Sequence, residues 1–427
     1  MSTKSIEPRP AVEELDWALH LQPCGALLIE RTSLFYARLS STGAALALHL
    51  ATTGSVERTT DVLNALEPGE PLSADDLRFW LESEPSTQGW EPMLSGRSLR
   101  VTGSTEAYLP LSCSLQLTNA CNLSCSFCYA SSGRTMAGEL EPDAWLAVMR
   151  RLSTAGVASV TLTGGEPTTA RGFPELLANA SALFTSVDVF TNGLRFPDRL
   201  SRLVAALGNV RCQVSVDGLA ARHDSVRGRS GSFAAAMETI ARLAARGVGV
   251  VVTMTVTEDS CDDVRAVAAH AEKAGAEVFR VGGVVPVGRG GNDDFELTPG
   301  ATENAERQLG EARATAQSLE VQGWDACGDP IEEIREAGIE PDFCLPGYLN
   351  WHVRANGQVT PCQIESATLG HILEETLEAL GAPERLTAVR TAARSCGCLR
   401  RVRLPEDGDV PFSVIERRSR RAEAGAC

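Results

Sequence analysis

Three cysteines lie close together in the segment CNLSCSFC, where Cys121, Cys125 and Cys128 have the spacing C-x3-C-x2-C. Three thiolates this close suit an iron–sulfur cluster or part of a zinc site. A structural zinc ion usually has four protein ligands, and the next cysteine, Cys212, lies far along the chain. Three ligands on a four-iron cluster leave one iron open to a small molecule. The spacing therefore favours a 4Fe–4S cluster with an open iron.

A second group of cysteines lies in the C-terminal part of the chain, at Cys344, Cys362, Cys396 and Cys398. Four thiols suffice for one further 4Fe–4S cluster. Only one residue separates the last two, so Cys327 or Cys427 could replace a member of that pair. The alternative is that these are buried structural thiols. A disulfide framework is excluded as an interpretation, because the chain is long, its 13 cysteines are odd in number and no export signal opens it.

Alternating strand and helix patterns begin at Leu111 and would position the first cysteine group. Apolar segments predict six strands, at 112–118, 158–163, 186–191, 210–216, 248–256 and 276–282. Helical patterns separate them, such as 142–152, which begins at Pro142 and has apolar residues on one face. This alternation predicts an α/β fold with a parallel sheet closed or partly closed into a barrel. Its functional residues are expected at the carboxyl ends of the strands.

The first hundred residues predict a separate module. GALLIER (25–31) and LFYARLS (34–40) have the pattern of a strand hairpin, and helical patterns follow at 42–53, 57–66 and 73–84. Two strands and three short helices suggest a winged-helix-like domain. Pro, Gly and Ser residues in 85–108 predict a linker.

Composition and charge restrict the class of protein. Hydrophobic residues make up 43% of the 427 residues, which is ample for packed cores. A net charge of -16 argues against general nucleic-acid binding, which depends on Lys and Arg meeting phosphates. No signal peptide pattern opens the chain, and no stretch of about 20 residues is free of charge. The sequence therefore predicts a soluble, cytoplasmic protein that binds neither nucleic acid nor membrane.

The cysteine spacing, with Phe127 before the third cysteine, resembles the radical S-adenosylmethionine (SAM) enzyme superfamily. The resemblance continues at successive strand ends. Ser215 and Asp217 end the fourth strand, where the family contacts the ribose of SAM, and Arg227 lies in a segment similar to one that carries an arginine for the SAM carboxylate. The second strand is followed by a GGEP segment like the one that receives the methionine amino group in the family: Gly164, Gly165, Glu166 and Pro167.

Two further segments fit the same family. TNG (191–193) ends the third strand, and Arg280 with the run PVGRG (286–290) fits the end of the sixth. The resemblance implies a partial (β/α)6 TIM-like barrel, with a 4Fe–4S cluster on the first cysteine group that binds SAM. It also implies that one electron, from an external donor such as a flavodoxin or ferredoxin, cleaves SAM to a 5′-deoxyadenosyl radical. That radical removes a hydrogen from an unactivated carbon.

The C-terminal cysteines resemble the family's auxiliary-cluster extensions, called SPASM and Twitch. Cys344-x12-Gly357-x4-Cys362 matches their C-x(9–15)-G-x4-C element. The longer SPASM run C-x2-C-x5-C-x3-C is absent, which favours the Twitch-like type with one auxiliary 4Fe–4S cluster. The chain departs from the pattern in closing with C-x-C instead of C-x2-C. Such a cluster would accept an electron from the substrate radical or ligate the substrate, which favours a net oxidation.

The N-terminal module is similar in element order to the peptide chaperone of pyrroloquinoline-quinone biosynthesis, a fold that recurs as the leader-recognition domain of ribosomal-peptide maturases. Such modules take a leader peptide as an added strand. The rival interpretation of a winged helix is DNA binding. Residues 1–110 hold 8 Lys and Arg against 15 Asp and Glu, and the helix at 73–84 carries Asp75, Asp76, Glu82 and Glu84 against Arg78. A recognition helix facing phosphates should not be acidic.

These observations predict three domains: a leader-recognition domain with linker (1–105), a radical SAM partial barrel (106–295) and a Twitch/SPASM-like domain (296–427). The predicted function is oxidative modification, most simply crosslinking, of a ribosomally made precursor peptide (RiPP). Alternatives are a peptide epimerase or decarboxylase, or a radical enzyme acting on another protein or a small molecule. A more distant alternative is an iron–sulfur redox sensor that binds DNA. No side chain can be named from the sequence as a catalytic base or hydrogen donor.

Overall fold

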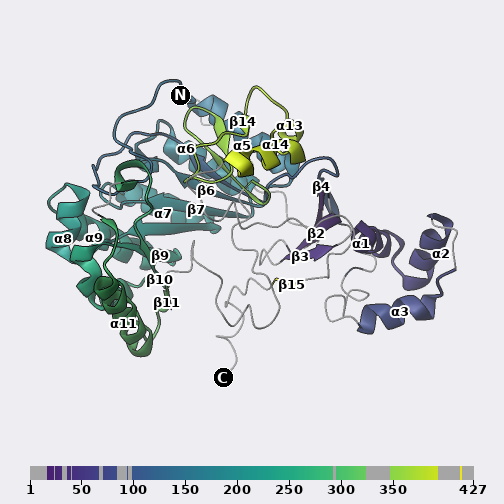
Figure 1. Ribbon diagram of the computed structural model, residues 1–427, viewed down its shortest axis with the longest axis horizontal. Helices are drawn as coiled ribbons and strands as arrows, with labels where there is room; N and C mark the ends of the chain where they lie inside the picture. The colour runs from purple at the N-terminus through teal and green to yellow at the C-terminus, as the bar shows by residue number, and fades with distance from the viewer. Residues whose placement is uncertain are drawn as a thin grey trace. The chain divides into compact units, whose positions relative to one another are not determined.

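The computed structural model describes residues 17–23, 25–30, 36–39, 41–66, 71–83, 94, 99–291, 295–323, 347–392 and 414–415. These residues form two compact units, each with its own sheet (Figure 1). The first unit holds the described residues up to Leu109 together with Val414 and Ile415, and the second holds those from Pro110 to Ala392. The described residues after 295, apart from the pair at 414–415, thus belong to the same unit as the predicted barrel.

The first unit contains a five-stranded sheet with the order β15-β3-β2-β1-β4. The strands are β1 (Trp17–Gln22), β2 (Gly25–Glu30), β3 (Tyr36–Leu39), β4 (Arg100–Gly103) and β15 (Val414–Ile415). The predicted hairpin is β2 and β3. Strands β1 and β4 were not predicted, and β4 lies where a linker was expected. Its four residues pair in parallel with β1, a contact between distant parts of the chain that no local pattern reveals.

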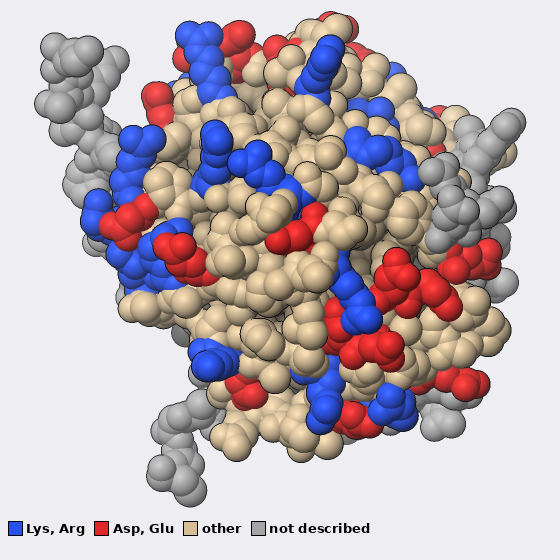
Figure 2. All heavy atoms as spheres, turned by 90° about the vertical axis from the view of Figure 1, so that its left-hand side faces the viewer, with Lys and Arg blue, Asp and Glu red and all other residues tan. Residues whose placement is uncertain are grey.

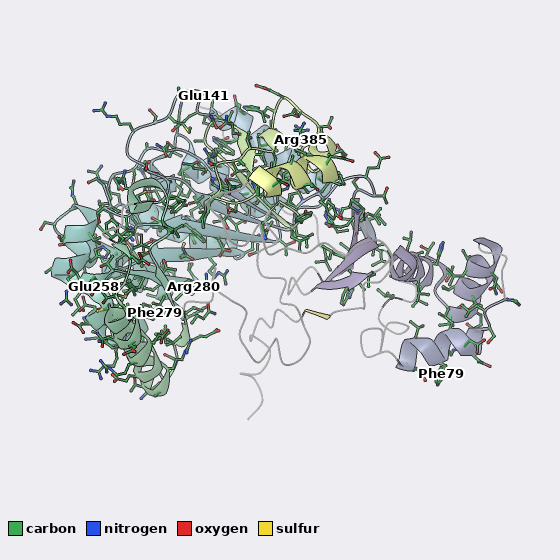
Figure 3. The ribbon with its side chains drawn as sticks, in the orientation of Figure 1. Phe79, Glu141, Glu258, Phe279, Arg280 and Arg385 are labelled. Atoms are coloured by element: carbon green, nitrogen blue, oxygen red, sulfur yellow. The ribbon has the colours of Figure 1, made fainter. Side chains whose placement is uncertain are left out.

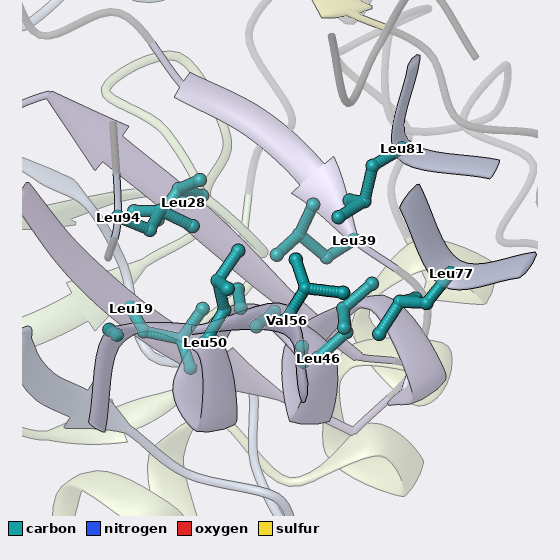
Figure 4. Close-up of a cluster of buried hydrophobic side chains, with 13 residues drawn as sticks. Leu19, Leu28, Leu39, Leu46, Leu50, Val56, Leu77, Leu81 and Leu94 are labelled. Carbon is teal, nitrogen blue, oxygen red and sulfur yellow. The ribbon is translucent and has the colours of Figure 1, made fainter. Parts of the chain in front are cut away.

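Three helices follow the hairpin, as predicted: α1 (Ser41–Thr53), α2 (Val56–Leu66) and α3 (Ala74–Ser83). Their apolar side chains and those of the sheet form one buried cluster, shown in Figure 4, in which Leu19, Leu28 and Leu50 are at most 1% exposed. At the start of α3, Ser73 and Asp76 form the predicted cap: the Ser73 hydroxyl accepts from the Asp76 N–H at 3.1 Å. The first unit therefore has a core of its own.

The second unit is built on a ten-stranded sheet with the order β11-β10-β9-β8-β7-β6-β5-β12-β13-β14. All six predicted strands are present and pair in parallel in chain order, which confirms the partial barrel. They are β5 (Ser112–Gln116), β6 (Ser159–Thr163), β7 (Ser186–Thr191), β8 (Val210–Ser215), β9 (Val250–Val256) and β10 (Val278–Gly283).

Two parallel strands that the sequence did not predict extend this sheet at its two sides. β11 (Glu320–Gln322) pairs with β10, and β12 (Asn350–Val353) pairs with β5. β12 continues into antiparallel β13 (Gln358–Thr360) and β14 (Gly370–His371). The segment that carries Cys362 is thereby attached directly to the first strand of the barrel.

Helices cover the apolar face of the strands. Leu115, Leu162 and Val189 are register neighbours with no exposed surface, and they belong to this face. The helices are α5 (Pro142–Ala155), α6 (Phe173–Leu183), α7 (Asp198–Leu207), α8 (Ala220–Arg227), α9 (Ser232–Ala244), α10 (Val264–Lys273), α11 (Pro299–Thr315), α13 (Leu377–Leu380) and α14 (Pro383–Ala392), with short 3₁₀ helices η1 (Pro167–Thr169), η2 (Glu258–Asp263) and η3 (Gly288–Gly291).

Helix hydropathy and surface charge, in the part of the chain that the structure describes, bear on binding to membranes and nucleic acids. No helix within the described ranges is both long and apolar enough to cross a membrane. On the face in Figure 2, basic and acidic side chains are interspersed. A continuous basic surface for phosphates is not found on that face.

Candidate active site

A pocket of about 310 Å³ opens at the carboxyl ends of the parallel strands. It is lined by the loop that follows β5, by the ends of β6 to β10 and by Gln363, which follows β13. Cys121, Cys125 and Cys128 all line it, and they come from one loop. Strand ends of this kind are where α/β proteins place their functional residues. The pocket is therefore the candidate active site.

Backbone hydrogen bonds fix the shape of the cysteine loop. Cys121 N–H donates to Gly133 O at 3.0 Å, and Gly133 N–H donates to Asn119 O at 3.0 Å, which closes the loop at its base. Ser126 N–H donates to Val226 O at 3.0 Å and attaches the middle of the loop to α8. Burial raises the pKa of the Cys121 thiol to about 11. A metal that binds here must therefore displace a proton that the thiol holds at neutral pH.

Gly164 and Gly165 line the pocket. Their backbone lies directly against the residues before Cys121. A Cβ atom at Gly164 would lie 2.7 Å from Thr118 O, and one at Gly165 would lie 2.4 Å from Ala120 O. Gly165 N–H donates to Thr118 O at 2.8 Å. Only glycine permits this approach, so the two glycines join the end of β6 to the start of the cysteine loop.

Glu166 and Pro167 lie behind the pocket wall and do not line it. The Glu166 carboxylate is 1% exposed and accepts hydrogen bonds from Thr191 Oγ1 and Asn192 N, both at 2.8 Å. It also accepts from Thr168 Oγ1 at 2.7 Å. Burial raises the pKa of this carboxyl group, while these donors lower it. Glu166 thus connects β6 to β7, and only the two glycines of the GGEP segment face the pocket.

Ser215 and Arg227 line the pocket, whereas Asp217 lies beneath it. Asp217 forms a buried ion pair with the Arg227 guanidinium, the two side chains being 1% and 9% exposed. Its other oxygen accepts from Thr255 N–H at 2.9 Å, and its own N–H donates to His223 Nδ1 at 3.0 Å. Asp217 therefore orients Arg227 and connects β8 to β9. The structure gives it no place on the pocket surface, where a ribose would be contacted.

The comparisons with known proteins agree with this geometry. Residues 115–270 match the family model described as the radical SAM superfamily. The chain is 44% identical over 396 residues to the sporulation killing factor maturation protein SkfB of Bacillus subtilis (strain 168), which covers 92% of this chain and 94% of that protein. The chain belongs to the radical SAM superfamily. The resemblance inferred from the cysteine spacing and the strand ends is thereby confirmed.

Solved structures share the fold over most of the chain. Streptococcus suis SuiB bound to S-adenosylmethionine superposes with a TM-score of 0.65 at 16% identity, covering 90% of this chain and 93% of that one. SuiB bound to the precursor peptide SuiA gives a TM-score of 0.63 at 15% identity, with the same coverage of both chains. At these identities the similarity concerns the fold.

The residues of the radical SAM pocket fit a 4Fe–4S cluster with one open iron, because three thiols of one loop line the pocket. The thiolates of a 4Fe–4S cluster each bind a different iron and surround it from several sides. Asn122 Nδ2 is buried beside the first cysteine without a partner, and an N–H there can donate to a cluster sulfur. Cys121, Cys125 and Cys128 would hold the cluster, with SAM on the open iron.

Cys362 lies close to this radical SAM pocket. The neighbouring Gln363 lines the pocket and accepts a hydrogen bond from Tyr129 Oη at 3.2 Å. Tyr129 directly follows the third cysteine of the loop. The other expected ligands of an auxiliary cluster lie outside the described residues, as do their possible replacements: Cys344, Cys396, Cys398, Cys327 and Cys427.

Several pocket residues were not identified from the sequence as site residues. They are polar residues at alternate positions of otherwise apolar strands, a pattern that the sequence does show: Gln213, Thr253 and Thr255. Arg280, adjacent to buried Phe279 on β10 (Figure 3), donates from Nε to Gln322 Oε1 of β11 at 2.9 Å. Phe127 lines the pocket and meets Phe295 edge-on, with ring centroids 6.2 Å apart.

Replacing Asp217 by Ala should lower the free energy of unfolding by about 3–5 kcal/mol, because Arg227 is then buried without its partner. Urea unfolding of the metal-free protein measures this loss. The control is Arg171→Ala, whose ion pair with Glu141 is 83% and 72% exposed and should contribute at most about 1 kcal/mol. Equal, small losses in both variants would contradict the structural role of Asp217.

Proposed function

We propose that this radical SAM enzyme oxidatively modifies, most simply by crosslinking, a ribosomally made precursor peptide. The observation that carries the proposal is the set of three cysteines from one loop in a pocket at the ends of five parallel strands. The similarity to SkfB, named as a maturation protein, covers nearly the whole chain and supports a peptide substrate. The fold shared with SuiB in its complex with a precursor peptide supports it further.

The pocket is suited to radical chemistry because its own side chains offer little acid–base chemistry. Among the described residues that line it there is no Asp, Glu, His or Lys, and its charged side chains are arginines. A reduced cluster held here would give one electron to bound SAM, which would then break into methionine and a 5′-deoxyadenosyl radical able to take a hydrogen from the substrate. The chain's own residues position the reacting groups and exclude water. Gly164 and Gly165 provide a backbone wall, and Arg227, oriented by Asp217, offers a guanidinium to a carboxylate.

Two parts of the proposal concern other regions of the chain. An auxiliary 4Fe–4S cluster on Cys344, Cys362, Cys396 and Cys398 would accept the electron left after hydrogen removal, and the position of Gln363 in the pocket wall supports this for Cys362. The first unit would bind the leader of the precursor. Strand addition takes place at the edge of a sheet, and the five-stranded sheet of this unit ends at β4 on one side and at β15 on the other. A flavodoxin or ferredoxin would supply the electron for SAM cleavage.

High-resolution mass spectrometry of the precursor after turnover in heavy water tests the reaction. A crosslink should lower the peptide mass by two hydrogens, with one 5′-deoxyadenosine formed per link. Epimerisation would leave the carbon skeleton unchanged and introduce one solvent deuterium at an α-carbon, and decarboxylation would remove carbon dioxide. Either of these outcomes would reject crosslinking. SAM cleavage that is not stimulated by the peptide would reject the peptide substrate itself.

A further inference from the structure

The short turn after β10 lies against the cysteine loop and contacts it through one arginine. Arg289 donates from its backbone N–H to Cys128 O at 2.9 Å. Its side chain donates from Nε to Cys125 O and from Nη1 to Ser132 O, both at 2.8 Å. A single residue thus binds three carbonyl groups of the loop that carries the proposed cluster ligands. The contacts span the loop from its second cysteine almost to its closing residue, Gly133.

The glycines on both sides of Arg289 make this contact sterically possible. Gly288 has a φ of +60°, and a Cβ atom there would lie 2.2 Å from Tyr129 O. A Cβ at Gly290 would lie 2.7 Å from Val285 O and 2.9 Å from Phe127 O. No larger residue fits at either position without moving backbone. The GRG part of the PVGRG run is therefore shaped to bring this arginine against the cysteine loop.

The charged groups around Arg289 differ from those around Arg227, another arginine that lines the pocket. Arg227 is neutralised by Asp217 in a buried ion pair. The side-chain acceptors of Arg289 are neutral carbonyl oxygens, which leave its positive charge in place beside the loop. Reduction of an iron–sulfur cluster adds one negative charge, and a nearby positive charge in a protein interior favours that step.

We propose that Arg289 is a positioning residue that holds the cysteine loop in its ligand-binding shape and makes reduction of the cluster on that loop easier. The inference rests on the proposed cluster at Cys121, Cys125 and Cys128. It assigns two separable tasks to one side chain. The two side-chain contacts, with Cys125 O and Ser132 O, depend on the planar fork of a guanidinium, whereas the electrostatic task needs only a positive charge.

Two substitutions separate these tasks. Arg289→Gln removes the charge and the fork, and Arg289→Lys keeps the charge while losing the fork. The matched control is Arg242→Gln on α9, which also removes an arginine that donates to a backbone carbonyl, that of Phe196, but does not line the pocket. All proteins are reconstituted with iron and sulfide without oxygen. The midpoint potential is then measured on the cluster whose electron paramagnetic resonance signal changes when SAM is added.

We expect Arg289→Gln to lower the equilibrium constant for reduction about tenfold, which is about 59 mV for one electron. Arg289→Lys should restore the potential, yet lose iron to a chelator faster than the wild type, as Arg289→Gln does. Arg242→Gln should match the wild type in both measurements. If Arg289→Gln does not fold, the faster iron loss of Arg289→Lys at wild-type potential supports the inference.

Two results would overturn the inference. The first is that both Arg289 variants have the midpoint potential and the rate of iron loss of the wild type. The second is that Arg242→Gln shows the same lower potential and faster iron loss as Arg289→Gln, because both changes would then reflect general destabilisation. If the wild type itself holds no SAM-responsive cluster, the proposed function fails. If it does hold one and Arg289 is without effect, only the role of Arg289 fails.

Discussion

Replacing Cys121, Cys125 and Cys128 together by Ala is expected to remove about four irons per chain and to abolish SAM cleavage. These are the cysteines among the described residues that line the pocket, so no other described thiol there can take their place. The wild type should hold about eight irons in two clusters. Iron and sulfide analysis after anaerobic reconstitution gives the first quantity, and chromatographic detection of 5′-deoxyadenosine gives the second.

Two further variants test whether the iron loss is specific. Cys212→Ala removes a thiol in the strand core, fully buried and away from the pocket, and should keep all the iron. Cys344→Ala with Cys362→Ala should also leave about four irons, but still permit SAM cleavage that is uncoupled from the peptide. Zinc in the wild type, or unchanged iron in the triple variant, would show that the cluster assignment is wrong.

Removal of residues 1–100 is expected to weaken binding of the full precursor by more than about tenfold while SAM cleavage persists. The physical reason is that these residues supply β1, β2, β3 and the buried cluster of the first unit, whereas the pocket belongs to the second unit. Fluorescence anisotropy with a labelled precursor measures the dissociation constant of each protein. An unchanged constant would contradict leader recognition by the first unit.

The mode of recognition can be tested on the peptide itself. Strand addition depends on backbone N–H groups of the leader, which proline lacks, so proline replacements should weaken binding more than alanine replacements at the same positions. A peptide with the composition of the leader in scrambled order serves as the control. Equal effects of proline and alanine would point to recognition by side chains alone.

The elements of the fold that leave a local pattern in the sequence were predictable. Six parallel strands follow from short apolar segments separated by helices, because each strand is buried on the face that the helices cover. β4, β11 and β12 have three or four residues each and exist because a distant strand offers them hydrogen bonds. Such pairing leaves no periodic signal in the short strand itself. These elements could not be inferred from the sequence.

The site was predictable in its parts that depend on spacing. Cys121, Cys125, Cys128, Gly164 and Gly165 meet in one pocket, as the sequence indicated. The prediction placed Glu166 and Asp217 beside the cofactor, whereas the structure places both carboxylates behind the wall, where they connect neighbouring strands. A sequence motif marks residues that belong to a site. The motif does not distinguish the residues that face the pocket from the residues that hold those pocket residues in place.

A chain shortened before residue 347 to isolate the barrel would lose β12 and expose the edge of β5. The truncation would also remove Trp351, which is 1% exposed on β12, and the backbone groups that pair with Ser112 to Leu115. An unpaired apolar edge strand promotes aggregation and pairing between chains. Loss of activity after such a truncation would report damage to the sheet next to the cysteine loop. Cysteine substitutions in the full-length protein are therefore the sound way to ask what the auxiliary cluster contributes, since they leave that edge covered.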